Sequence, residues 1–107
     1  MSGGATATFR ADQVERQVSL LPGAPLPRYP EPLRNAGIEG RFIAQFTVTE
    51  LGIAETDSLR FLQSDNALFE QSVRNVLKSM RFAPAEIAGK KVRQLVQMPF
   101  VFTLAGR

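Results

Sequence analysis

One stretch of the 107-residue chain decides the fold: Val92-Arg93-Gln94-Leu95-Val96-Gln97-Met98-Pro99-Phe100-Val101-Phe102-Thr103-Leu104. It is rich in Val, Phe and Thr, which favour β-strands. Every second position is largely apolar, as in a strand that buries one face. The stretch therefore predicts a strand whose inner face consists of Val92, Gln94, Val96, Met98, Phe100, Phe102 and Leu104.

Pro99 decides where this strand lies in the sheet. Proline has no N–H, and within sheets it is confined to edge strands and bulges, so we predict an edge strand. If Pro99 turns its missing N–H outward, the outward backbone groups belong to residues of the same parity: Leu95, Gln97, Val101 and Thr103, with Pro99 contributing only its carbonyl. We predict that these five residues bind a partner strand. The alternative is that Pro99 only protects the edge from aggregation.

The composition fits one soluble globular domain, with 44% hydrophobic and 21% charged residues. The chain has no Cys and no His, which excludes disulfides, thiol chemistry, the usual zinc sites and His-dependent catalytic triads. Its glycines are isolated and form no phosphate-binding loop. We therefore expect no catalytic residue, no metal site and no cofactor, and predict that the chain is not an enzyme.

The charge is mildly basic, at +3. After Glu86 the chain carries four basic residues and no acid, which indicates a solvated turn and tail or a surface for an acidic partner. Aromatic residues do not alternate with the basic ones, so we expect no nucleic-acid binding. No apolar run reaches the length of a membrane-spanning helix.

Residues 1–27 are expected to form a flexible, extended lead. Val14, Val18 and Leu20 alternate with polar residues and favour a short strand. Residues 21–27 contain three prolines, which exclude a helix or a central strand and predict an extended linker.

The domain itself is expected to span residues 28–104, followed by a tail at 105–107. Two prolines suit the first turn of a helix and Gly37 suits the position after its last turn, which predicts a short helix over residues 30–36.

Two strands are predicted next. Residues 40–48 contain no proline and alternate in polarity, which suits a half-buried central strand with Phe42, Ala44, Phe46 and Val48 inward. A turn at Glu50-Leu51-Gly52 leads to a second strand over about residues 53–63. Alternation breaks at Leu62, which predicts a bulge or strand end there.

A second helix is predicted after the helix caps at residues 64–66. One apolar stripe at helical spacing consists of Phe69, Val73, Val76, Leu77 and Met80. The element order is then helix, strand, strand, helix, strand. We predict an α+β fold with a small three-stranded antiparallel sheet and two helices packed on one face.

Several short motifs accompany these elements. Arg28-Tyr29-Pro30 precedes the short helix, Met80-Arg81-Phe82-Ala83-Pro84-Ala85 follows the long one, and Met98-Pro99-Phe100-Val101-Phe102 lies in the last strand. With the turns at Glu50-Leu51-Gly52 and Gly89-Lys90-Lys91-Val92, this order resembles the TonB C-terminal domain family over about residues 27–104. Met80 stands where the family commonly has Trp.

The resemblance implies a periplasmic domain that couples the proton-motive force of the inner membrane to outer-membrane transporters for active uptake, for example of siderophores. Its partner would be the TonB box, a short extended transporter segment that adds as a strand to the last strand of the sheet. The resemblance also implies an upstream inner-membrane anchor, on which proton-channel proteins act, and a Pro-rich linker. We therefore expect the chain to be the excised C-terminal domain of an anchored protein.

The resemblance further implies that the segment around Arg28, Tyr29 and Arg34 contacts the transporter plug, with the two arginines facing acidic plug residues. Alternatively, Tyr29 packs as a lid beside the short helix. The exposed sheet edge also allows a homodimer by strand pairing, or cover in cis by the weak strand near residues 14–20. An alternative function is a TonB-like interaction domain of an envelope sensor or scaffold that is not coupled to transport.

Overall fold

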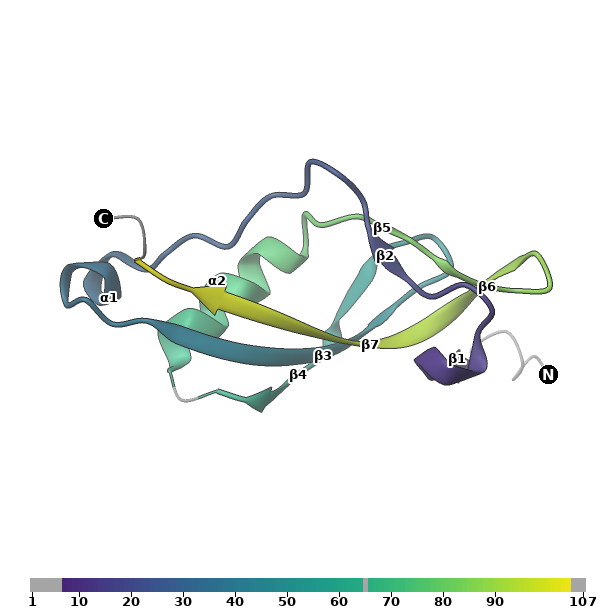
Figure 1. The fold of residues 1–107 in the computed structure, drawn as a ribbon, viewed down its shortest axis with the longest axis horizontal. Coiled ribbons are helices and arrows are strands. Elements are labelled where there is room, and N and C mark those ends of the chain that lie inside the picture. Colours follow the sequence, from purple (N-terminus) through teal and green to yellow (C-terminus); the bar gives the residue numbers. More distant parts are fainter. Residues whose placement is uncertain (1–6, 65, 105–107) are drawn as a thin grey trace.

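The computed structural model describes residues 7–64 and 66–104 (Figure 1). Its principal strands are β3 (Gly40–Val48), β4 (Ala54–Gln63) and β7 (Lys90–Phe102), with β3 between the other two and antiparallel to both. With helices α1 (Glu31–Asn35) and α2 (Ala67–Leu77), the element order is α1-β3-β4-α2-β7. The predicted α+β fold class, the element order and the central position of residues 40–48 are confirmed. The sheet has five strands rather than the three predicted, because the short strands β1 (Thr8–Phe9) and β6 (Ala85–Ile87) also pair with β7.

Four shorter strands are also present, and three of them were not predicted. β1 (Thr8–Phe9) runs parallel to β7, β2 (Ser19–Leu20) pairs with β5 (Phe82–Ala83), and β6 (Ala85–Ile87) forms a hairpin with β7. A 3-10 turn (Ala11–Gln13) follows β1. Strands of two or three residues are too short to show alternation in polarity, so only the predicted strand near residues 14–20 has a counterpart, in β2. The predicted tail at 105–107 and the first six residues lie outside the described residues.

The helix α1 ends as its sequence predicts. The N–H of Ile38 donates to the carbonyl of Leu33 at 2.9 Å, and the N–H of Gly37 donates to Arg34 at 3.1 Å, which together form a Schellman motif. Gly37 takes the left-handed conformation that this ending requires, with φ of 72°. Leu33 is buried in the core, so α1 closes one end of the sheet on the side that α2 covers.

The helix α2 begins after Asn66, whose side chain accepts a hydrogen bond from the N–H of Leu68 at 2.9 Å. Such a cap contributes about 1 kcal/mol. The predicted stripe faces the sheet: Phe69, Val73 and Leu77 are fully buried, and Val76 packs against the same cluster. Asp65 lies outside the described residues.

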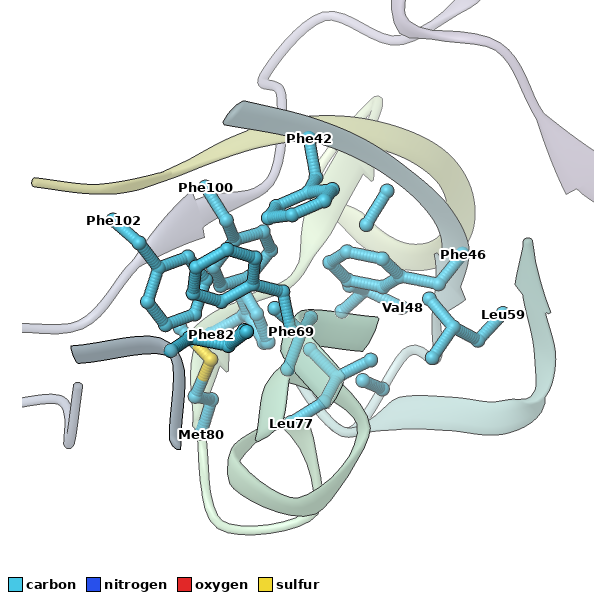
Figure 2. Packing of buried hydrophobic residues seen from close by; sticks show 14 residues of the cluster. Phe42, Phe46, Val48, Leu59, Phe69, Leu77, Met80, Phe82, Phe100 and Phe102 are labelled. Carbon is cyan, nitrogen blue, oxygen red and sulfur yellow. The ribbon is translucent and has the colours of Figure 1, made fainter. Parts of the chain in front are cut away.

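Aromatic rings fill the space between α2 and the sheet (Figure 2). Phe69 of α2 stacks on Phe102 of β7, with ring centroids 4.4 Å apart, and Phe42 of β3 packs against both. Each buried phenylalanine contributes about 2–3 kcal/mol from apolar burial. The core therefore fixes β7 through its even-numbered residues and leaves the odd-numbered ones on the opposite face.

The turn between β3 and β4 is held against β5. The N–H of Phe82 donates to the carbonyl of Gly52 at 3.0 Å. Gly52 has a φ of 80°, and a Cβ at this position would lie 2.1 Å from the carbonyl oxygen of Phe82. Only glycine combines this conformation with so close an approach of two backbones.

The outer edge of strand β7 as a candidate binding site

Strand β7 has one covered edge and one that is largely open. On the covered edge β3 pairs with it continuously, from Val48 opposite Gln94 to Gly40 opposite Phe102. On the other edge β1 pairs only with Arg93 and Gln94. From Leu95 onward, no strand among the described residues occupies this edge. We call it the outer edge of β7, meaning residues 95–103.

Hydrogen bonds of β3 show which way the backbone groups of β7 point. The N–H of Thr47 donates to Oγ of Ser58, and the N–H of Thr49 donates to the carbonyl of Ile53, both at 2.9 Å and both toward β4. Since successive residues of a strand point to opposite sides, the even-numbered residues of β3 point toward β7.

The same alternation then applies to β7. Because even-numbered residues of β3 lie opposite even-numbered residues of β7, those pairs exchange hydrogen bonds. Ile43 and Pro99 therefore form a non-hydrogen-bonded pair, and the ring nitrogen of Pro99 faces the outer edge. The outward backbone groups of this edge belong to Leu95, Gln97, Pro99 and Val101, with Thr103 one residue beyond the end of β7.

The side chains of these residues lie on the face away from α2. Gln97, Pro99, Val101 and Thr103 are exposed and Leu95 is half-buried. Val101 is 57% exposed, an unusual value for a large apolar residue within a strand. The side chain of Gln97 donates to that of Gln45 on β3 at 3.2 Å. The structure thus brings four of the five predicted residues together on one regular strand, with Thr103 directly after it.

The opposite edge of the sheet, formed by β4, is less regular. Its pairing with β3 shifts between Ile43 and Ala44, where Leu62 is the extra residue of the predicted bulge, and again between Gln45 and Thr47. Bulges twist an edge and protect it from pairing with other chains. The outer edge of β7 therefore offers a longer uninterrupted template than β4 does.

An ion pair fixes the start of the outer edge. Arg93 of β7 donates to both carboxylate oxygens of Glu55 on β4, at 2.7 and 2.8 Å, and also to the hydroxyl of Thr8. The hydrogen bonds from Arg93 lower the pKa of Glu55 below its ordinary value, although burial acts in the opposite direction. The same bonds raise the pKa of Arg93.

Arg28, Tyr29 and Arg34 lie together at a cavity of about 300 Å³ between α1 and α2. Both arginine side chains are exposed, and neither forms an ion pair with the described part of the chain. Tyr29 packs edge-on against Phe69 and Phe102 and donates its hydroxyl to the carbonyl of Ile38. Burial and, to a lesser degree, the carboxylate of Glu39 raise the pKa of Tyr29. Tyr29 therefore has the structural role considered for it, and the two arginines remain available.

Residues 14–20 do not cover the outer edge of β7, contrary to the expectation from the sequence. Ser19 and Leu20 pair with β5 rather than with β7, and the two residues of β1 cover only the start of the edge. The idea that residues 14–20 compete with a partner strand for the edge is therefore wrong. Sequence reasoning also missed that residues 20–27 run beside β7, because proline-rich segments carry no periodic signal.

Two further findings concern the described residues. They contain no group of three or more His, Cys, Asp or Glu placed to hold a metal ion. Neither of the helices in ranges 7–64 and 66–104 is long and apolar enough to cross a membrane.

Comparisons with known proteins agree with this architecture. The solution NMR structure of the Pseudomonas aeruginosa TonB CTD superposes with a TM-score of 0.68 at 29% sequence identity, covering 85% of this chain and 90% of that one. Protein TonB of Pseudomonas aeruginosa is 33% identical over 82 residues, which amount to 76% of this chain and 23% of that protein. This chain thus spans less than a quarter of that relative.

A family model matches a similar part of the chain. The family described as Gram-negative bacterial TonB protein C-terminal matches residues 25–104, which include every principal strand and both helices. This chain belongs to the TonB C-terminal family.

Proposed function

We propose that this chain is the periplasmic domain of a TonB-type energy transducer. It acts without catalysis, by binding the TonB box of outer-membrane transporters as a strand added to the outer edge of β7. An upstream inner-membrane anchor, driven by proton-channel proteins, then pulls on the docked transporter segment. Family membership and the likeness to the TonB CTD support this proposal.

The open edge of β7 carries the proposal. From Gln97 onward it presents outward N–H and C=O groups on alternate residues, and a partner strand can satisfy them with its own backbone. The carbonyl of Leu95 already accepts a hydrogen bond from the side-chain amide of Gln94. The opposite edge of β7 is held by β3 over nine consecutive pairs, so a load on the docked strand passes directly into the centre of the sheet.

A second contact is proposed at the α1–α2 cavity. Arg28 and Arg34 there face solvent without a carboxylate partner in the described chain, and they suit acidic residues of the transporter plug. This contact lies outside the strand-pairing surface, so it contributes mainly to the rate of association and its salt dependence.

Proline substitution at the outer edge tests strand addition. Gln97→Pro combined with Val101→Pro removes two outward N–H donors and leaves the buried side chains of β7 unchanged. Two lost hydrogen bonds, at about 1 kcal/mol each, weaken binding of a synthetic TonB-box peptide about thirtyfold. Isothermal titration calorimetry measures the affinity, and circular dichroism checks the fold.

The matched control is the double variant Gln97→Ala with Val101→Ala, which removes the same side chains and keeps both N–H groups. It should bind the peptide within about threefold of the wild type. Unchanged affinity in the folded proline variant would show that the peptide binds elsewhere and would refute strand addition to β7.

A further inference from the structure

The first residues of β7 are not available to a partner strand, because the chain itself covers them. On the side away from β3, β1 pairs in parallel with Arg93 and Gln94. In a parallel ladder a residue bonds to the two residues that flank its partner. Phe9, which lies opposite Gln94, therefore pairs with the outward groups of Arg93 and Leu95. The cover by β1 thus extends to the N–H of Leu95.

The carbonyl of Leu95 is occupied as well. It accepts a hydrogen bond from the side-chain amide of Gln94 at 3.2 Å. The same side chain is only 4% exposed, and its oxygen accepts a hydrogen bond from the N–H of Val18 at 2.8 Å. Both outward groups of Leu95 are therefore paired within the domain, and the outward groups open to a partner strand begin at Gln97.

The chain turns sharply where β1 ends. The 3-10 turn over Ala11–Gln13 follows directly, with the N–H of Gln13 donating to the carbonyl of Arg10 at 3.0 Å. The N–H of Arg10 donates in return to the side chain of Gln13 at 2.8 Å. Arg10 and Ala11 line one hollow together with Leu95 and Gln97, so the turn lies beside this part of β7. It therefore stands in the path of any strand that runs along the outer edge past Gln97.

Further contacts hold this part of the chain near the start of β7 (Figure 1). The N–H groups of Glu15 and Arg16 donate to the carbonyl of Glu86 at 2.9 and 3.1 Å, and the N–H of Glu86 donates to Arg16 at 2.9 Å. The carboxylate of Glu15 accepts a hydrogen bond from the N–H of Ala88 at 2.9 Å, and Val18 packs against the core. None of these contacts uses a backbone group of the outer edge, so a docked strand does not compete for them.

We propose that residues 8–18, which we call the stop, set the end of the docked strand at Gln97. A docked transporter segment then pairs only with residues 97–103, and a longer segment has to leave the sheet at the stop. Because the docked strand cannot slide toward the start of β7, the stop also limits its register. Residues 8–18 precede residues 25–104, which carry the family match, so family membership alone does not predict the stop. This proposal rests on the strand addition proposed above.

Three labelled peptides provide the probes. The first is a TonB-box peptide as long as the free part of the edge, and the other two are the same peptide extended by Thr-Val-Thr at its N-terminus or at its C-terminus. Fluorescence anisotropy measures the three affinities. The wild type is expected to bind all three within about twofold, because the extension beside the stop finds no free backbone group.

Phe9→Pro removes the stop from the edge within the full chain. The substitution deletes the N–H with which Phe9 pairs with β7, and Phe9 is half-buried and lies outside the core cluster. The variant should bind the short peptide as the wild type does and one of the extended peptides at least about fivefold more tightly, which corresponds to one added hydrogen bond. Phe9→Ala, the matched control, keeps the N–H and should show no gain from either extension.

Hydrogen exchange of the wild-type complex gives a second measurement that needs no variant. With each extended peptide bound, the amide of Phe9 should keep the protection that it has in the free protein, and new protection should begin at Gln97. Loss of protection at Phe9 on binding would show that the docked strand displaces β1, and it would overturn the stop.

The outcomes separate this proposal from strand addition. Tighter binding of an extended peptide by the wild type, or no gain in Phe9→Pro that still binds the short peptide, would overturn the stop and leave strand addition standing. An equal gain in Phe9→Ala would assign the effect to the lost side chain and also overturn a stop formed by backbone pairing. Failure of the wild type to bind any of the three peptides would overturn both proposals.

Discussion

Ile43 and Pro99 lie opposite each other in the β3–β7 ladder as a non-hydrogen-bonded pair. The ladder therefore loses no hydrogen bond at Pro99, although this residue has no N–H. The register continues unshifted on both sides of it. The same residue removes one donor from the outer edge and leaves its carbonyl as an acceptor. A proline that would break a central strand is thus tolerated at a position where β7 is paired on one side only.

This arrangement predicts an alternating pattern of hydrogen exchange in the free protein. Amides that point toward β3 should exchange slowly, and those on the outer edge should exchange fast because they have no partner. Amide exchange followed by NMR should find Val96, Met98 and Phe100 protected and Gln97 and Val101 unprotected. The reverse pattern would place the nitrogen of Pro99 against β3.

The Glu55–Arg93 ion pair predicts a stability difference that depends on pH. Bonds from Arg93 lower the pKa of Glu55 below the ordinary value of 4.5, so the pair stabilises the fold above that value. As the pH falls through the folded-state pKa, this contribution is lost. Glu55 is partly exposed, and Glu55→Gln should therefore cost at most about 1 kcal/mol at pH 7.

Urea denaturation at pH 7 and pH 3 measures this effect. The difference between wild type and Glu55→Gln should be present at pH 7 and smaller at pH 3. Asp57→Asn changes the net charge equally at an exposed position and should show a smaller difference at both values. An equal loss for Glu55→Gln at pH 7 and pH 3 would show that the pair does not contribute through its charge.

Among the turn glycines, Gly52 is predicted to tolerate substitution least. A Cβ there would lie 2.1 Å from the carbonyl of Phe82, in addition to the strain of a positive φ. Gly52→Ala should destabilise the fold by about 3 kcal/mol or more. Gly89 has a similar φ of 78° and nothing within 4 Å of the added Cβ, so Gly89→Ala should cost only about 1 kcal/mol. Thermal unfolding compares the two, and equal losses would rule out the backbone clash.

Charge reversal tests the contact at the α1–α2 cavity. Arg28→Glu should slow association with a purified TonB-dependent transporter and weaken its dependence on salt, because one steering charge is reversed. Arg60→Glu introduces the same change at an exposed position on β4, away from this cavity, and should leave association unchanged. Surface plasmon resonance at several salt concentrations measures both. Equal effects of the two variants would show that only net charge matters.

The sequence predicted the principal elements because each carries a periodic or local signal. Three local features have their counterparts in the structure. They are the alternation of polarity in residues 40–48, the apolar helix stripe that begins at Phe69, and the helix ending at Gly37. Pro99 predicted an edge strand, and β7 has this character from Leu95 onward, whereas β1 pairs with its start at Arg93 and Gln94.

Long-range features could not be predicted in the same way. The pairing of Arg93 with Glu55 joins two strands 38 residues apart, and nothing in either segment indicates the other. The path of residues 21–27 beside β7 depends on hydrogen bonds to Arg81 and Ser72, which lie in other parts of the chain. Such relations follow only from the assembled sheet.

The most direct test of strand addition is an NMR titration of the domain with a TonB-box peptide, followed by hydrogen exchange of the complex. Binding is expected to shift the amides of the outer edge and to slow their exchange, most strongly at Gln97, Val101 and Thr103. Even-numbered residues of β7 should keep the protection that they have in the free protein. New protection along β4 in place of β7 would contradict the proposed binding site.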